Sequence, residues 1–327
     1  MEAQDIAKLY FQAIMGCGHL LGEEMLVAKR IADEQARLKP CEAEPLTEPL
    51  GPQYVRLNLR RAMAEDLPPL WIARLMKCSM PAQLPPRDRV ADALARLNMP
   101  ELSPFIQHLS DDPAWLPNHS DAYHRAYAPA YRVISRQCAA LLPALIATAK
   151  LMHLDKALIC IDGPCGSGKT TLAGLLGSII DAAIVPMDDF FLPHPAKTPE
   201  RLAQPGGNAD WERVVAEFLE PWQQGDAVSY RPYDCHSGDY AEPVSVPCKQ
   251  YTILEGSYSL MPAIARHAAL KLFLQIEEPI QHQRILARNG EKVLNMFIQR
   301  WIPLEKAYFQ AYGLPDPSCL VLSTVQE

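Results

Sequence analysis

The spacing of apolar residues divides the chain into two halves with different patterns. Over residues 6–14 and 21–32, apolar side chains recur three and four positions apart, which predicts two amphipathic helices. Residues 55–59 alternate apolar and polar side chains and predict a short strand. Proline-bounded segments over residues 66–109 predict short helices, and residues 139–152 predict an apolar helix. Residues 1–150 are therefore expected to form a mainly α-helical domain.

From about Leu151 the pattern becomes short apolar runs that alternate with helical segments. The runs expected to be strands cover residues 157–161, 183–187, 251–254 and 270–276, and residues 168–180 are expected to form a helix. Strands that alternate with helices form parallel sheets with helices on both faces. Residues 151–327 therefore predict an α/β domain of the P-loop NTPase type.

Length and composition agree with two soluble globular domains. The 327 residues are 49% apolar and 21% charged. Residues 1–150 carry 17 basic and 17 acidic side chains, so the net charge of −7 arises in the second half, where a nucleic-acid groove is not expected. The nine cysteines show no C-x-x-C spacing and indicate neither a disulfide framework nor a zinc site. Without a leader or a membrane-length apolar run, we expect a cytoplasmic protein that binds neither membrane nor nucleic acid.

The strongest motif is the segment Gly-Pro-Cys-Gly-Ser-Gly-Lys-Thr at residues 163–170, which fits G-x-x-x-x-G-K-[ST] between an expected strand and an expected helix. Glycines let backbone N–H groups turn toward phosphates at a helix N-terminus, where the helix dipole favours anions. We expect Lys169 to reach the phosphates and the Thr170 hydroxyl to bind Mg²⁺. The residues predicted to hold ATP are Gly163, Pro164, Cys165, Gly166, Ser167, Gly168, Lys169, Thr170 and Thr171.

The end of the second expected strand points to phosphoryl transfer onto a hydroxyl. It reads Met187-Asp188-Asp189-Phe190-Phe191. A hydroxyl acceptor must lose its proton during transfer, so a carboxylate near the γ-phosphate is the natural base. One aspartate is expected to be this base and the other to cap the following turn. The chain has no N-K-x-D motif, which a GTPase would need.

These motifs, in this order, resemble the uridine kinase branch of P-loop kinases, which includes phosphoribulokinase and the P-loop pantothenate kinases. The resemblance covers about residues 151–313. It implies that Asp188, rather than Asp189, is the catalytic base. It also implies that Glu255, at the end of an apolar strand, holds Mg²⁺ through water. Arg284 and Arg288, four residues apart on one helix, correspond to lid arginines that close over the phosphates.

The resemblance also implies residues for the acceptor pocket. Asn208 and Asp210 correspond to a polar segment that touches sugar hydroxyls, and either could instead cap the helix that follows. Tyr233, Asp234 and His236 resemble an element around the base and sugar. A packed tyrosine and a turn aspartate would be the purely structural roles of the first two.

The sequence thus predicts an Mg-ATP kinase with a nucleoside such as uridine as acceptor. Relatives use the same machinery on pantothenate, glycerate, sugars or sugar phosphates, so these acceptors stay open. The motifs are also compatible with an ATP-binding regulatory switch or with a bifunctional enzyme. Residues 1–150 have no assigned role, and a homo-oligomer is possible by analogy with the family.

Overall fold

The computed structural model describes residues 1–18, 22–235 and 237–323, which form two compact units, Met1–Ala149 and Lys150–Glu327. Each unit has its own hydrophobic core. Within the described residues, no helix has the length and apolar character needed to cross a membrane.

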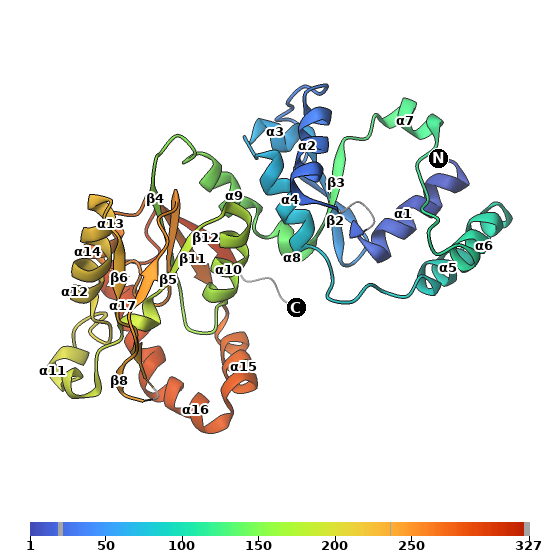
Figure 1. Ribbon diagram of the computed structural model, residues 1–327. Helices are drawn as coiled ribbons and strands as arrows, with labels where there is room; N and C mark the ends of the chain where they lie inside the picture. The colour runs from blue at the N-terminus through green and yellow to red at the C-terminus, as the bar shows by residue number, and fades with distance from the viewer. Residues whose placement is uncertain (19–21, 236, 324–327) are drawn as a thin grey trace. The chain divides into compact units, whose positions relative to one another are not determined.

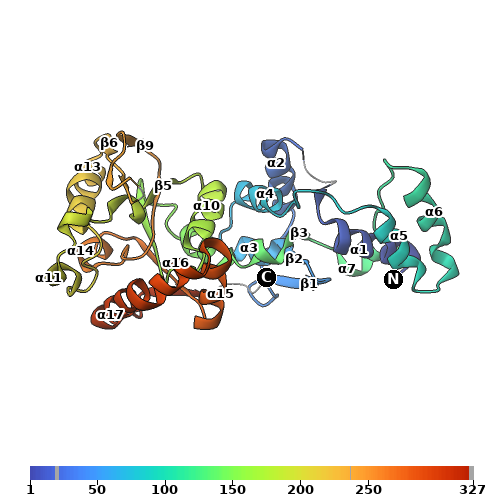
Figure 2. The ribbon, with the colours of Figure 1, turned by 90° about the horizontal axis from the view of Figure 1, so that it is seen from below.

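The N-terminal unit combines helices with a small antiparallel sheet (Figures 1 and 2), in the strand order β1-β2-β3. Its helices pack in part through a cluster that α1, α5, η2 and α6 form around Phe11, Val90 and Leu94. The elements are α1 (Ala3–Met15), α2 (Glu24–Gln35), β1 (Thr47–Leu50), β2 (Tyr54–Asn58), α3 (Leu59–Ala64), α4 (Pro69–Cys78), α5 (Asp88–Ala95), η2 (Pro100–Leu102), α6 (Ser103–Asp111), α7 (Asp121–Tyr127), β3 (Tyr131–Ser135), α8 (Arg136–Ala139) and α9 (Leu142–Ala149).

The helical prediction for this half is confirmed, but the sheet is larger than the sequence indicated. Only β2 corresponds to an expected strand. β1 escaped detection because it is a short edge strand with exposed Glu48 and Pro49, which hide the alternation of a half-buried strand. β3 pairs with β2 across a long sequence separation, as in Tyr54 opposite Ser135, and no local pattern reveals such a partner.

The C-terminal unit is built on a parallel sheet with the strand order β12-β11-β4-β10-β5, which confirms the predicted α/β class. Its elements are β4 (Ala157–Asp162), α10 (Lys169–Ile180), β5 (Ala183–Pro186), η3 (Met187–Phe190), η4 (His194–Ala196), α11 (Pro199–Leu202), α12 (Trp211–Arg213), the π-helix η5 (Val214–Leu219), α13 (Glu220–Gln224), β6 (Val228–Tyr230), β7 (Tyr233–Asp234), β8 (Asp239–Tyr240), β9 (Val244–Val246), β10 (Tyr251–Glu255), α14 (Pro262–Ala265), β11 (Leu270–Gln275), α15 (Glu278–Asn289), α16 (Glu291–Met296), the π-helix η6 (Phe297–Trp301), α17 (Ile302–Tyr312) and β12 (Cys319–Ser323).

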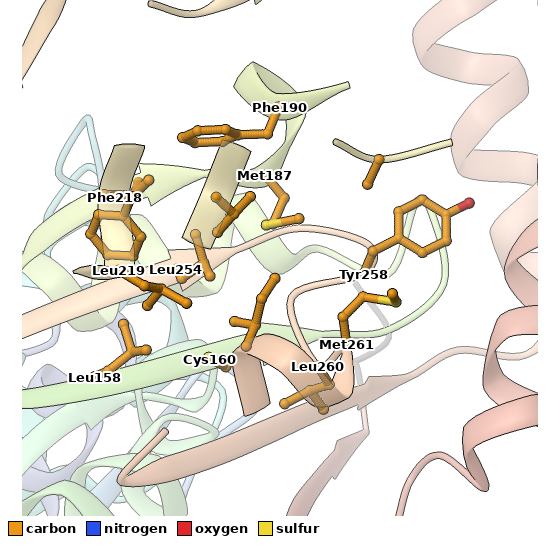
Figure 3. Close-up of a cluster of buried hydrophobic side chains, with 14 of the residues drawn as sticks. Leu158, Cys160, Met187, Phe190, Phe218, Leu219, Leu254, Tyr258, Leu260 and Met261 are labelled. Atoms are coloured by element: carbon orange, nitrogen blue, oxygen red, sulfur yellow. The ribbon is translucent and has the colours of Figure 1, made fainter. Parts of the chain in front are cut away.

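Helices cover both faces of this sheet. Figures 1 and 2 show α10 on one side and α13 and α14 on the other, and Figure 1 shows α12 on the same side as α13 and α14. On the second side, Phe218 and Leu219 of η5 pack against the central strands at Leu158 and Leu254 (Figure 3). Every residue of β4 is buried, as expected for a central strand with both faces covered. Val214, Phe218 and Leu219 of η5 are thus part of the core, and Trp211 and Val215 pack against it.

Candidate active site

The candidate site lies where parallel strands end. β4, β5 and β10 are neighbours in the sheet and finish at Asp162, Pro186 and Glu255. Because parallel strands share one carboxyl edge, the segments that follow them meet there. These segments are the predicted phosphate loop and η3, so the sheet brings together motifs that lie far apart in the sequence.

Backbone geometry explains why glycine is required at two positions of this carboxyl edge. Gly163 has φ 142°, and a Cβ atom there would collide with the carbonyl oxygen of Leu274 on β11. Gly256 has φ 135°, and its Cβ would lie 2.7 Å from Cβ of Met187, at the start of η3. Only glycine fits both the conformation and the space. The two residues let the phosphate loop and η3 approach the strand ends closely.

The phosphate loop leads directly into α10, as predicted. Gly168 is the N-cap of this helix, so the backbone N–H groups of its first turn face the loop. Lys169 is buried, and its Nζ donates hydrogen bonds to the carbonyl oxygens of Gly163 at 2.7 Å and Pro164 at 3.0 Å. The Ser167 hydroxyl is also buried, and it has no hydrogen-bond partner among the described residues. A polar atom of this kind fits a loop that receives phosphate oxygens.

The two residues predicted to hold Mg²⁺ contact each other. The Thr170 hydroxyl donates to the Glu255 carboxylate, with Oγ1 at 3.0 Å from Oε1. Burial raises the pKa of Glu255, the charges of Asp188 and Asp189 add to this, and the Thr170 hydrogen bond and Lys169 oppose it. A hydroxyl and a carboxylate are oxygen donors of the type that Mg²⁺ prefers, so this pair fits the ion.

The two aspartates of η3 have different environments. Asp189 accepts a hydrogen bond of 2.7 Å from the hydroxyl of Tyr230, a buried residue on β6. The Asp188 side chain is open to solvent, yet surrounding protein atoms desolvate it in part and raise its pKa. The charges of Lys169 and Arg288 lower the same pKa. Asp189 therefore has a structural partner, while Asp188 interacts with the charges of the phosphate loop and of α15.

The two predicted lid arginines both belong to α15. Arg284 donates from Nη1 to the carbonyl oxygen of Gly166 in the phosphate loop, at 3.4 Å. Arg288 is exposed, and its Nε donates to Asn289 Oδ1 at 2.7 Å. One arginine thus touches the loop, and the charge of the other acts on Asp188.

The structure adds supporting residues that the sequence did not reveal. Asp162, fully buried, accepts hydrogen bonds from Gly163 N at 2.7 Å, Leu260 N at 2.9 Å and the Tyr308 hydroxyl at 2.8 Å. Glu305 on α17 accepts from Cys165 N at 2.9 Å and from the Ser257 hydroxyl at 2.6 Å. These two acids connect the phosphate loop to the C-terminal helix α17.

Gln281 on α15 supports the same loop, because its Nε2 donates to the carbonyl oxygen of Cys165 at 2.8 Å. The one local signal for these contacts was the position of Asp162 directly before the motif. Glu305, Tyr308 and Gln281 carry no motif that marks them.

The residues predicted for the acceptor pocket occupy several structural roles. Asp210 caps α12, since its Oδ1 accepts from Arg213 N at 3.2 Å. Asn208 is buried, and its Oδ1 has no hydrogen-bond partner within the part of the chain that the structure describes. The buried Tyr233 accepts at its hydroxyl from His194 N at 3.2 Å, and Asp234 accepts from Ser237 N at 3.3 Å. His236 lies outside the described residues.

The N-terminal unit contains a groove of about 630 Å³, whereas the phosphate loop belongs to the other unit. α1, α5 and the turn between β1 and β2 line it, together with Arg56 of β2. None of the residues predicted from the sequence to act in the site belongs to this groove.

No protein-family model and no curated protein matches the chain. Solved structures do resemble it. A possible uridine kinase from Bacillus stearothermophilus has a TM-score of 0.44 and 16% identity, over 55% of this chain and 96% of its own. A putative fructose transport system kinase from Silicibacter has a TM-score of 0.42 and 21% identity, over 53% of this chain and 93% of its own. A gluconokinase from Sinorhizobium meliloti has a TM-score of 0.29 and 14% identity, over 54% of this chain and 86% of its own.

Proposed function

We propose that the C-terminal unit is an ATP-dependent kinase that transfers a phosphoryl group to a hydroxyl of a small molecule. The observation that carries this proposal is the position of Asp188 in η3, at the carboxyl edge of the sheet where the phosphate loop leads into α10 and where the charges of Lys169 and Arg288 act on it. A carboxylate on the acceptor side, within the influence of phosphate-binding cations, is the arrangement that phosphoryl transfer to a hydroxyl requires.

In the proposed step, the acceptor oxygen attacks the γ-phosphorus in line with the bond to the β-bridging oxygen. That bond breaks, ADP leaves with the electron pair, and the acceptor proton passes to Asp188. The carboxylate must be ionised to accept this proton. Because partial desolvation by the surrounding protein raises the pKa of Asp188, the pH at which activity falls on acidification should lie above the ordinary range of an aspartate.

The rest of the machinery would hold and neutralise the nucleotide. The backbone N–H groups of the loop and Lys169 would bind the phosphates, while Arg284 and Arg288 would offset charge that builds up on the transferred group. Thr170 and Glu255 would hold Mg²⁺, which supplies neutralisation of the phosphate oxygens when bound.

The acceptor that the family resemblance puts first is a nucleoside such as uridine. Under this proposal, the unpartnered Oδ1 of the buried Asn208 is the best-supported contact to an acceptor hydroxyl. Asp210 and Tyr233 already make internal hydrogen bonds, so they would shape the pocket. Pantothenate, glycerate and sugars remain candidate acceptors, and a homo-oligomer stays a prediction.

The test is ADP release by the full chain with Mg-ATP, measured across nucleosides, pantothenate, glycerate, sugars and sugar phosphates. Acceptor-dependent turnover should fall by roughly 10²-fold or more in Asp188→Asn, the typical contribution of a general base. Binding of Mg-ATP should persist in this variant. The exposed Asp226, a residue of the loop after α13, provides the matched control Asp226→Asn, which should keep full activity. Unchanged turnover in Asp188→Asn would contradict the assignment of the base.

A further inference from the structure

Lys197 lies in an unusual setting directly after η4. It is half-buried, and its Nζ lies 5.8 Å from the ring centre of Phe191 and 5.6 Å from that of Trp301. Phe191 follows the two aspartates of η3, and Trp301 ends η6. The ammonium group is therefore held between aromatic rings from two segments that are far apart in the sequence.

A second cation shares one of these rings. The guanidinium carbon of Arg300 lies 4.6 Å from the ring centre of Trp301. Among the residues that the structure describes, neither Lys197 nor Arg300 has a carboxylate within ion-pair distance. Burial lowers the pKa of Lys197, and the positive charge of Arg300 lowers it further. Two cations beside one aromatic ring, one of them partly desolvated and neither paired with a carboxylate of the described residues, favour the binding of an anion.

Lys197 lies in a loop close to the residues proposed to bind the phosphoryl acceptor. The loop that carries it is held by β7, since His194 N donates to the Tyr233 hydroxyl at 3.2 Å. Burial raises the pKa of the Cys235 thiol, directly after β7, while the charge of Lys197 lowers it and that of Asp188 raises it. Lys197 also contacts the ring of Phe191, which follows Asp188 by three residues, so Lys197 lies beside the segment that carries the proposed base.

We propose that the phosphoryl acceptor is an anionic alcohol, whose hydroxyl meets Asp188 and whose carboxylate or phosphate group binds Lys197 and Arg300. The inference rests on the proposed kinase function and favours a charged acceptor over the uncharged nucleoside of the family resemblance. The negative charges of the Asp188 and Asp234 carboxylates would repel an anionic group. The charged end of the acceptor therefore lies toward the two cations, and its hydroxyl lies toward Asp188.

Matched pairs of acceptors that differ in charge test this inference by binding. The pairs are glycerate and glycerol, pantothenate and panthenol, and ribose 5-phosphate and ribose, with uridine as the nucleoside. Isothermal titration calorimetry on the full chain, with Mg²⁺ and a non-hydrolysable ATP analogue, should show saturable binding of at least one anion and much weaker binding of its neutral partner. Comparison of the carboxylate pairs with the phosphate pair shows which of the two anionic groups the protein binds.

The variant Lys197→Met keeps the aliphatic stem between the rings and removes the charge. It should weaken binding of the anion by about tenfold or more, as expected for the loss of a charge-assisted contact. The affinity for the neutral partner should change less than about twofold. Lys197→Arg should restore most of the affinity. The exposed Lys150 provides the control Lys150→Met, with unchanged binding. Equal binding of neutral and charged partners, or equal loss of both in Lys197→Met, would overturn the inference.

Turnover of the same pairs separates this inference from the kinase proposal. Turnover that prefers the anion, with a raised KM and a nearly unchanged kcat in Lys197→Met, supports both. Anion binding that depends on Lys197, without any ADP release, would contradict the kinase and support the anion site. Turnover of uridine or neutral alcohols alone would support the kinase and overturn the anionic acceptor.

Discussion

At the scale of single residues, Asp162 is a buried carboxylate of the C-terminal unit. It is fully buried before the phosphate loop, and burial raises its pKa to about 6, against the effects of Lys169 and of the hydrogen bonds that it accepts. The ordinary value is 3.8, so the folded protein binds this proton more tightly than the unfolded chain. Its contribution to stability is therefore largest below pH 4 and is lost as the pH rises toward 6.

Asp162→Asn should remove this pH dependence. The free energy of unfolding of the wild type, minus that of the variant, should fall by about 2–3 kcal/mol between pH 4 and pH 7, since each unit of pKa shift corresponds to about 1.4 kcal/mol. Urea unfolding of both proteins across this pH range measures the difference. Parallel stability curves would show that Asp162 has an ordinary pKa in the fold.

At the scale of elements, one buried carboxylate joins two helices of the N-terminal unit. Asp5, in the first turn of α1, accepts from Glu2 N at 2.8 Å, Ser120 N at 2.8 Å and the Ser120 hydroxyl at 2.9 Å. Ser120 is in turn the N-cap of α7. Burial opposes ionisation of Asp5, but these hydrogen bonds and His119, whose Nδ1 lies 3.3 Å away, keep its pKa below the ordinary value.

Asp5→Ala should destabilise the N-terminal unit by about 3 kcal/mol or more, because it leaves several buried donors without an acceptor. The exposed Asp33 on α2, which pairs with Lys29, supplies the control: Asp33→Ala should cost less than about 1 kcal/mol. Chemical denaturation followed by circular dichroism measures both. A similar small effect of the two variants would mean that the contacts of Asp5 contribute little to the fold.

At the scale of the whole molecule, the chain consists of two units with separate cores. The proposed nucleotide-binding residues all belong to the C-terminal unit. A ligand stabilises only the part of a protein that binds it in the folded state. The two units should therefore respond differently to nucleotide.

Thermal unfolding should show two transitions, and Mg-ATP at about 100 times its dissociation constant should stabilise one of them by about 2.7 kcal/mol. Calorimetry with and without nucleotide measures this shift, and Lys169→Met should abolish it. If a single transition moves as a whole, the two units unfold as one cooperative structure.

Local sequence patterns predicted the elements that contiguous residues specify. The runs that became β4, β5, β10 and β11 are mostly apolar, and the glycine pattern before α10 identifies the phosphate loop. β12 was missed because Cys319–Ser323 is a short strand of half-buried and exposed residues at the sheet edge. The edge strand β1 was missed because half of its residues are exposed. The strand β3 was missed because its partner β2 lies far away in the sequence.

The sequence by itself determined the parallel α/β class and the position of the phosphate loop, because both depend on residues that are neighbours in the chain. Tertiary structure decided which side chains meet at the site. Tyr230 binds Asp189, 41 residues before it, and Tyr308 binds Asp162 across 146 residues. The two cations near Trp301 likewise come from separate segments. Such contacts join residues that become neighbours only in the folded chain, so local periodicity and motifs do not predict them.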